Sequence, residues 1–480
     1  MSRINTNVDS LVALNNLART NQQLGVSLTR LSTGVRVNSG KDDPAGLISG
    51  EFLRSEINSI SSAIGNNNRA NAVLSTTDSA LGEIGDLLGG IRGILTTSAN
   101  RGVLSQDEIN ANQSAIDSAI SSVNRIANST QFGGRKLLDG SLGFQLSGVG
   151  RTDVANATFS DVQVNLANFN ATGSAITVNV TLTTAATQAS VALAQTTATI
   201  DSTIEVIGNG GSAIVKVGSG QNVLDAINSV SDVTGVIATG SSTVYLNSSN
   251  FGSDSFVTVN NVAGGLISGL TTNVKGTDVA GSINGQAFSG KGLNATLKTS
   301  NLDLTLTFGQ SVSASTATNF TIASGGAKFQ LGIQLNSANQ INVGLDSFSS
   351  ASLGNVFVDT AGTRQDRTVA SLATGGQNSL TASTDRSAIA VGIIQDAISK
   401  VTTTRARIGS IQSNTIETNL RSLQVNKENL SSARSQIVDT DFAEETANLT
   451  RLQILVQAGT SSLAIANSRP QSVLSLLSGR

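Results

Sequence analysis

The chain has 480 residues, 39% of them hydrophobic, and its formal net charge of −2 gives no electrostatic reason to expect nucleic-acid or membrane binding. It contains no cysteine and no histidine, which excludes disulfides, cysteine nucleophiles, Ser-His-Asp triads and zinc sites of the usual His/Cys kind. We therefore expect a core of Leu, Ile, Val and Ala, without a metal, a cofactor or a catalytic site.

Large apolar residues of the N-terminal segment recur at steps of three, four or seven, which is typical of one stripe along a long helix. They are Ile4, Val8, Leu11, Leu14, Leu17, Leu24, Leu28 and Leu31. We expect this helix to end at Gly34, because the turn-rich segment Asn38-Ser-Gly-Lys-Asp-Asp-Pro-Ala-Gly46 follows.

Helical spacing resumes after this turn over residues 57–95 and 109–123, with a break predicted near Arg101 and Gly102. Asp107 and Glu108 stand where negative charge favours the start of a helix. The N-terminal part of the chain is therefore predicted to be mainly helical up to about residue 146.

The pattern changes to period two between about residues 147 and 375. Alternating apolar and polar residues predict strands at residues 176–182, 256–259 and 302–308, separated by Gly-rich turns. A short helix is expected at residues 223–227. This stretch is predicted to form antiparallel β structure in one or two domains.

The C-terminal part returns to helical spacing over residues 394–430, and a last helix is expected after Asp439 and Asp441, two acids suited to capping its start. Helices of about 30 residues would be ~45 Å long. Helices of this length draw most of their stability from packing, and the simplest partners are the helices at the opposite terminus.

The predicted fold is a mainly α-helical core, built from both termini in coiled-coil or bundle packing, with an inserted antiparallel β-rich outer region. The expected domains are residues 1–42 with 440–480, residues 43–146 with 376–439, and the insert at residues 147–375. An ordinary intramolecular bundle explains the apolar stripes. The two terminal helices alone would make only a thin core, however, which favours further contacts between subunits. The residues expected at such an interface are Leu11, Leu24, Leu28, Leu31, Lys41, Asp42, Asp43, Phe442, Leu449, Leu452 and Val456.

Two motifs offer weaker signals. The segment Gly285-Gln-Ala-Phe-Ser-Gly-Lys-Gly292 approaches a phosphate-binding loop, but it lacks the Ser/Thr after the lysine and precedes a predicted strand, so we interpret it as a turn. Lys41, Asp42 and Asp43 adjoin one another in a turn, where such residues cap the next helix or form ion pairs between subunits.

Both ends of the sequence resemble bacterial flagellin. The matching N-terminal segments are Ile4-Asn-Thr-Asn7, Leu31-Ser-Thr-Gly34, the turn 38–46, Thr130-Gln-Phe-Gly133 and Lys136-Leu-Leu138. The matching C-terminal segments are Arg405-Ala-Arg-Ile-Gly409, Glu428-Asn-Leu430, Asp439-Thr-Asp-Phe-Ala443, Gln457-Ala-Gly459 and Pro470-Gln-Ser-Val-Leu474. About half of the chain carries this resemblance, and the middle does not.

The resemblance implies a subunit of the extracellular flagellar filament, a helical homopolymer that drives swimming. Its terminal helices would line the central channel, the next helices would form a tube, and the insert would face solvent. It also implies type III export without a cleaved signal peptide, and contacts with an export chaperone, the filament cap and hook-junction proteins. A hook-filament junction protein and a surface adhesin acting through the insert are the alternatives.

In flagellins sensed by the animal innate receptor, the helix that matches residues 89–95 carries a polar and basic patch. Arg92 stands in that stretch, but Gly89, Gly90 and Gly93 replace larger side chains and Ala115 stands in place of an acid. The resemblance therefore implies weak receptor recognition.

Overall fold

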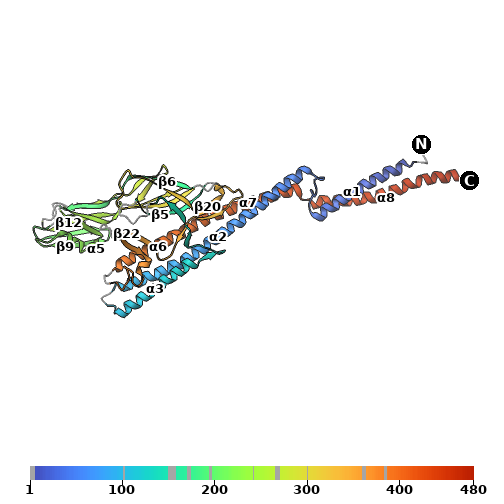
Figure 1. Cartoon of the computed structure of the whole chain (residues 1–480). Helices are drawn as coiled ribbons and strands as arrows, with labels where there is room; N and C mark the ends of the chain where they lie inside the picture. The colour runs from blue at the N-terminus through green and yellow to red at the C-terminus, as the bar shows by residue number, and fades with distance from the viewer. Residues whose placement is uncertain are drawn as a thin grey trace. The chain divides into compact units, whose positions relative to one another are not determined.

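The computed structural model describes residues 6–100, 103–149, 158–169, 175–193, 197–241, 243–264, 271–299, 301–358, 364–382 and 386–479 (Figure 1). The predicted break at Arg101 and Gly102 lies outside the described residues, as does Ile4. The chain forms two compact units, here called the terminal unit (residues 1–65 and 418–480) and the central unit (residues 66–417).

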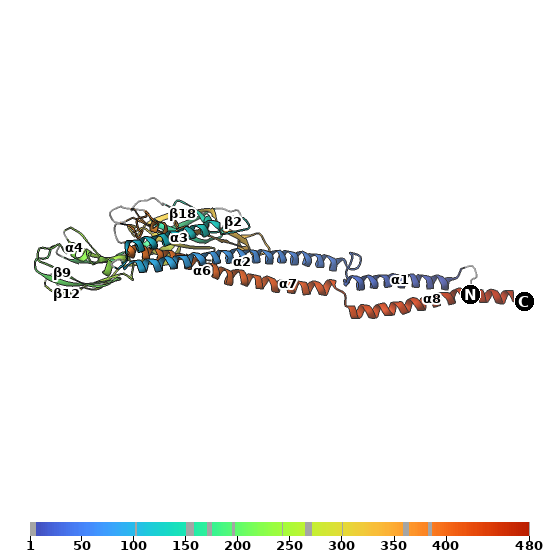
Figure 2. The same cartoon turned by 90° about the horizontal axis from the view of Figure 1, so that it is seen from below.

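In the terminal unit, helices α1 (Val8–Thr33) and α8 (Phe442–Ser478) lie side by side and run antiparallel (Figures 1 and 2). Gly34 ends α1 in the left-handed conformation with φ 71°, and its N–H donates to the carbonyl of Arg30, which confirms the predicted end. The start of α2 (Pro44–Ser98) packs against α7 (Glu417–Val438) through Ile60, Ala63 and Leu423. The described residues of Val8–Thr33 and Phe442–Ser478 are thus helical, as the apolar spacing predicted.

The central unit buries one large helical core. It is made by the rest of α2, by α3 (Gln106–Ser129), and by α6 (Ser387–Ser410) with the π-helix Ile411–Ile416 that follows it. Most residues of this unit at the predicted helical spacing are fully or almost fully buried, whereas Ile398 on α6 is partly buried. The buried ones include Ile84, Leu88, Ile91 and Leu95 on α2, Ile116, Ile120 and Val123 on α3, and Ile394, Val401 and Ile408 on α6.

A ten-stranded antiparallel sheet forms the larger β part of the central unit. Its strands lie in the order β19 (Ala327–Gln330), β20 (Gln340–Val343), β5 (Phe159–Ala167), β17 (Leu302–Phe308), β16 (Asn294–Lys298), β15 (Gln286–Lys291), β14 (Ala280–Ile283), β6 (Ile176–Thr184), β18 (Ala317–Gly325) and β4 (Phe144–Ser147). Its core gathers aromatic rings, with ring centroids 5.5 Å apart for Phe159 and Phe308 and 5.7 Å apart for Phe159 and Phe320. Two predicted strands, β6 and β17, lie in this sheet.

A second β part, which we call the nested lobe, spans β7 to β13 and is inserted between β6 and β14. One of its sheets has the order β13 (Thr271–Lys275), β12 (Phe256–Ala263), β8 (Ser202–Gly208), β9 (Gly211–Val217), and the other β10 (Val236–Thr239), β11 (Val244–Phe251), β7 (Gln188–Leu193). The predicted short helix is α4 (Val223–Asn228), followed by α5 (Ser231–Thr234). The lobe has an apolar core that shares no residue with the core of the ten-stranded sheet.

Short elements join these parts. They are β1 (Gln131–Phe132) with β2 (Arg135–Lys136), β3 (Asp139–Leu142) with β21 (Leu345–Ser347), β22 (Gly354–Val358) with β23 (Arg364–Thr368), and the 3₁₀ helices Ser337–Asn339 and Val369–Leu372. The strand pairs described are antiparallel, which confirms the predicted sheet type.

Candidate assembly surface

Helices α1 and α8 meet along one heptad seam. The shielded positions step alternately by three and four residues, as in a coiled coil. They are Ser10, Ala13, Leu17, Thr20, Leu24, Ser27 and Leu31 on α1, and Glu445, Leu449, Leu452, Val456, Gly459, Leu463 and Ala466 on α8. A Cβ built on Gly459 would lie 3.1 Å from Cδ1 of Leu17, so the absence of a side chain at Gly459 sets how closely the helices approach.

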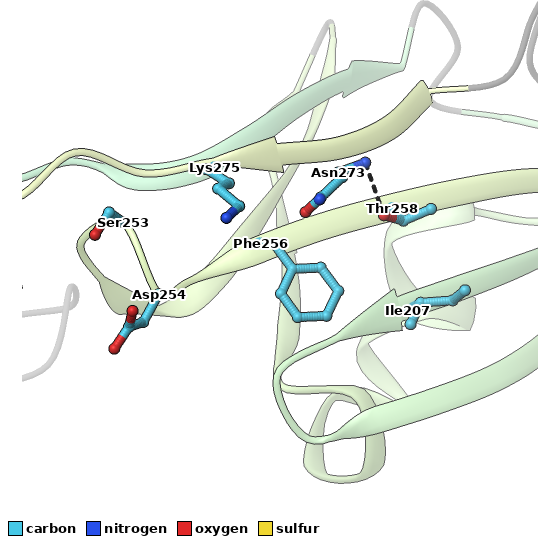
Figure 3. Close-up of a pocket in the computed structure, with 7 residues that line it drawn as sticks. All are labelled: Ile207, Ser253, Asp254, Phe256, Thr258, Asn273 and Lys275. Carbon is cyan, nitrogen blue, oxygen red and sulfur yellow. Dashed lines mark hydrogen bonds between the residues drawn. The ribbon is translucent and has the colours of Figure 1, made fainter.

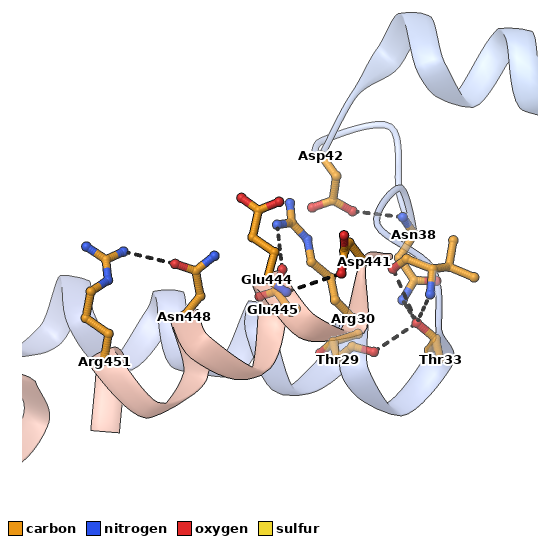
Figure 4. A network of polar contacts seen from close by, with 11 residues as sticks. Thr29, Arg30, Thr33, Asn38, Asp42, Asp441, Glu444, Glu445, Asn448 and Arg451 are labelled. Carbon is orange, nitrogen blue, oxygen red and sulfur yellow. Dashed lines mark hydrogen bonds and ion pairs between the residues drawn. The ribbon is translucent and has the colours of Figure 1, made fainter. Parts of the chain in front are cut away.

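Polar contacts fix both ends of this pair, and Figure 4 shows those at the end near Arg30 and Asp441. Arg30 lies 3.6 Å from the largely buried carboxylate of Glu445, and at the other end the Asn7 side-chain amide donates to the Ala466 carbonyl at 2.8 Å. Asp441 caps α8 by accepting from the N–H groups of Ala443 and Glu444 at 2.8 and 3.2 Å. The helices are therefore held in one register.

The same two helices leave many large apolar side chains outside the seam. A helix that is apolar on several sides is normally buried on several sides, whereas one seam covers only one. The side chains left between 39% and 62% exposed are Val8, Leu11, Val12, Leu14, Val26, Leu28, Phe442, Ile454, Leu455 and Ile465. Apolar surface of this extent is typical of a protein–protein interface.

The eight apolar residues predicted at the interface fall into two groups in the structure, one outside the seam and one on it. Leu11, Leu28 and Phe442 are about half exposed and lie outside the seam. The other five contribute to the seam within the chain, and they are Leu24, Leu31, Leu449, Leu452 and Val456. Ile454, Leu455 and Ile465 were not predicted at the interface, although their apolar side chains off the main stripe of α8 could have indicated it.

The turn between α1 and α2 uses both of its carboxylates locally. Asp42 accepts from the hydroxyl and N–H of Ser39, at 2.9 and 2.8 Å, and the Ser39 hydroxyl chiefly holds the pKa of Asp42 below its ordinary value. Asp43 accepts from the N–H of Gly46 at 2.9 Å at the start of α2, while Lys41 is exposed. Both acids therefore hold the turn in shape through hydrogen bonds to groups within it.

Further apolar surface lies just after this turn. Ile48 and Phe52 stand one helical turn apart on α2, and each is 73% exposed. Neither was predicted as an interface residue, because they precede the run of apolar positions that showed the helix.

A depression of about 560 Å³ lies in the nested lobe (Figure 3). It is lined by Ile207, Ser253, Asp254, Phe256, Thr258, Asn273 and Lys275. Two of these polar groups are already engaged, since the Ser253 hydroxyl donates to Asp278 at 2.5 Å and Asp254 pairs with Lys291 at 2.8 Å. The hydrogen bond from Ser253 chiefly lowers the pKa of Asp278, which makes that carboxylate a weak general base.

The segment Gly285–Gly292, which approached a phosphate-binding loop, forms strand β15, with only Gly285 and Gly292 in the turns on either side of it. The interpretation as a turn is therefore wrong for the middle of the segment, because Gln286–Lys291 pairs with β14 and β16 in the sheet. Across the described parts of the chain, no group of three or more acids was found that could hold a metal ion. None of the helices in the described part of the chain has an apolar stretch long enough to cross a membrane.

Both ends of the chain match a known protein family. The pattern of the bacterial flagellin N-terminal helical region matches residues 4–142, and that of the bacterial flagellin C-terminal helical region matches residues 391–477. The chain is 32% identical to the B-type flagellin of Pseudomonas aeruginosa and 30% identical to the flagellin of Salmonella typhimurium, in both cases over 99% of each chain.

Among solved structures, the chain is similar to FliC from Burkholderia pseudomallei, with 17% identity, a TM-score of 0.23, and coverage of 72% of this chain and 98% of that one. It is also similar to flagellar hook associated protein-3 from Legionella pneumophila, with 14% identity, a TM-score of 0.25, and coverage of 84% and 99%.

The family patterns cover the helical parts at both ends, and the full-length relatives extend the match across the β-rich insert. The fold predicted from the resemblance, a helical core with an inserted antiparallel β region, is the one described above. The chain belongs to the bacterial flagellin family and is a structural subunit of the flagellar filament.

Proposed function

We propose that copies of this chain self-assemble through the α1–α8 pair, with neighbouring copies covering the apolar side chains that the seam leaves exposed. The observation that carries this proposal is the exposure of Leu11, Leu28 and Phe442. These side chains stay exposed although α1 and α8 already pack against each other along the seam. Contacts between two different surfaces repeat without closing, which generates a helical filament. The role is mechanical, and no side chain performs a reaction.

Within this proposal, the predicted interface residues have three tasks. Leu11, Leu28 and Phe442 contact other copies. The seam residues Leu24, Leu31, Leu449, Leu452 and Val456 keep the helix pair in the shape that other copies recognise, and Lys41, Asp42 and Asp43 shape the turn that leads into α2. The three predicted domains, with the insert at residues 147–375 facing solvent, remain part of the proposal.

We also propose the partners and the route that the family implies. The subunit leaves the cell through the flagellar type III route, with an export chaperone on its C-terminal helices, and it meets the filament cap and the hook-junction proteins. No nucleic-acid or membrane partner is proposed. The junction-protein and adhesin alternatives are not favoured, because the full-length curated relatives named above are flagellins.

Paired substitutions on α1 test the assembly surface. We expect Leu11→Asn with Leu28→Asn to abolish filament growth on seeds, while the melting temperature of the monomer stays unchanged, because neither residue lies on the seam. The matched control is Asn15→Gln with Gln22→Asn, two exposed polar positions of the same helix, which should still form filaments. Normal filaments from the apolar double variant would contradict the proposal.

Weak recognition by the innate receptor remains a separate proposal. Gly89, Gly90 and Gly93 are exposed on α2 and have open space where a Cβ would lie, so this face presents little side chain beyond Arg92. A cell reporter assay should show weak activation, and strong activation at low dose would contradict it.

A further inference from the structure

The nested lobe is joined to the ten-stranded sheet by two short connectors. The chain enters the lobe at Thr187 and leaves it at Thr277, and the Thr187 N–H donates to the Thr277 carbonyl at 3.0 Å. Among the described strands, those of the lobe pair only with one another, and the lobe has an apolar core of its own. Parts of a chain that share neither a sheet nor a core are expected to move relative to each other unless a further contact holds them.

One polar cluster provides such a contact where the lobe meets the sheet. Asp278, on the connector that leaves the lobe, accepts from the hydroxyl of Ser253 and from its N–H, the latter at 2.9 Å. The same carboxylate accepts from the N–H of Gly292 at 2.7 Å. Ser253 lies on the turn between β11 and β12 of the lobe (Figure 3), whereas Gly292 lies on the turn between β15 and β16 of the sheet. One side chain therefore ties a turn of the lobe to a turn of the sheet.

The two turns also lie against each other directly. Lys291 and Asp254 form an ion pair of 2.8 Å across them, but both side chains are mostly exposed, and exposed pairs contribute little. The backbones approach more closely. A Cβ built on Gly252 would lie 2.6 Å from Cα of Gly292, and a Cβ built on Gly292 would lie 3.0 Å from the Phe251 carbonyl oxygen. The two glycines therefore let the turns dock backbone to backbone.

We propose that Asp278, Ser253 and Gly292 form a latch that fixes the orientation of the nested lobe relative to the ten-stranded sheet. A carboxylate that accepts three hydrogen bonds holds its donors more firmly than an exposed ion pair does. Without this carboxylate, the N–H groups of Ser253 and Gly292 lose their acceptor and the two turns separate. The connectors at Thr187 and Thr277 then act as a hinge, because a few loop residues can absorb a large change in backbone angles.

Distances between two spin labels test the latch, since the chain has no cysteine and labels attach only where one is introduced. One label is placed at Ile214→Cys, which is 64% exposed on the lobe, and the other at Thr296→Cys, which is exposed on β16 of the sheet. We expect a narrow distance distribution in the otherwise unmodified chain and one about twice as broad when Asp278→Ala is added. The full chain is measured as a monomer, so the result does not depend on self-assembly.

Two controls separate the latch from a general loosening of the fold. The first is Lys291→Ala, which removes the exposed ion pair at the same junction and should leave the distribution narrow. The second places both labels within the lobe, at Ile214→Cys and Ile237→Cys. Asp278→Ala should not broaden the distance between these two labels, because the latch sets the orientation of the lobe and not its internal packing.

Four results would overturn the inference. They are a broad distribution in the unmodified chain, an unchanged one in the Asp278→Ala variant, equal broadening in the Lys291→Ala variant, and equal broadening between the two labels within the lobe. If the Asp278→Ala chain does not fold, Ser253→Ala decides the question, because it removes only the hydroxyl that donates to Asp278. We expect Ser253→Ala to broaden the distribution, and one as narrow as in the unmodified chain would also overturn the inference.

Discussion

Single polar residues set where the helices begin and how the loops are held. Asp441 caps α8, as two acids before an apolar helix predicted. For α3, Asp107 and Glu108 were predicted only as favourable charges, whereas Glu108 forms a capping box with Ser105. These caps can be predicted from sequence because their partners are only two or three residues apart. The contacts of Arg407 with Asn165 and Gly344 are not, because they join residues distant in the chain.

Asp278 gives a prediction about pH. It accepts from Ser253 and from the Gly292 N–H at 2.7 Å, and these hydrogen bonds lower its pKa below the ordinary 3.8. A carboxylate whose pKa is lower in the folded chain than in the unfolded chain stabilises the fold at pH values above the unfolded pKa. This stabilisation is lost as the pH falls through the folded pKa. We expect Asp278→Asn to be less stable than the unmodified chain at neutral pH, with the difference shrinking from about pH 5 to about pH 2. Melting temperatures across this range check it, and a constant difference would speak against it.

At the scale of elements, spacing predicted the type of most segments but not their partners. Period two predicted β6, β12 and β17, yet nothing local indicated that β18 pairs with both β6 and β4. Likewise, the apolar stripe of α1 predicted a helix without separating Leu24, on the seam, from Leu28, off it. Both residues sit on neighbouring sides of the same helix, and only the position of α8 distinguishes them.

Gly459 allows the helix pair to be tested as an element. A larger side chain there meets Leu17, so Gly459→Leu should push α1 and α8 apart. We expect faster hydrogen exchange in both helices of the monomer. The control is Gly25→Leu on α1, where a built Cβ has nothing within 4 Å, and exchange should not increase. Equal protection from hydrogen exchange in the Gly459→Leu variant and the unmodified chain would show that the close approach at Gly459 does not stabilise the helix pair.

The nested lobe is a separable part of the central unit. The chain enters and leaves it at Thr187 and Thr277, where the Thr187 N–H donates to the Thr277 carbonyl at 3.0 Å and the two hydroxyls lie 2.8 Å apart. Replacing residues 188–276 with an Asn-Gly turn should therefore leave the other cores folded and filament assembly intact. Circular dichroism and electron microscopy check this. An insoluble chain, or a folded one without filaments, would show that the lobe is structurally required.

For the whole molecule, sequence predicted a helical core from both termini and an inserted β region, and the comparisons confirmed the family. The nesting of one β lobe inside another was not predicted, because it depends on pairing between β6 and β14, on either side of the lobe.

Electron microscopy of seeded assembly tests the central claim most directly. The full chain is compared with a truncation that lacks residues 1–34 and 440–480, which removes α1 and α8 together. We predict long helical filaments from the full chain and a folded, soluble truncation that forms none. Filaments from the truncation, or a full chain that stays monomeric or forms only short rings, would contradict assembly through the terminal helix pair.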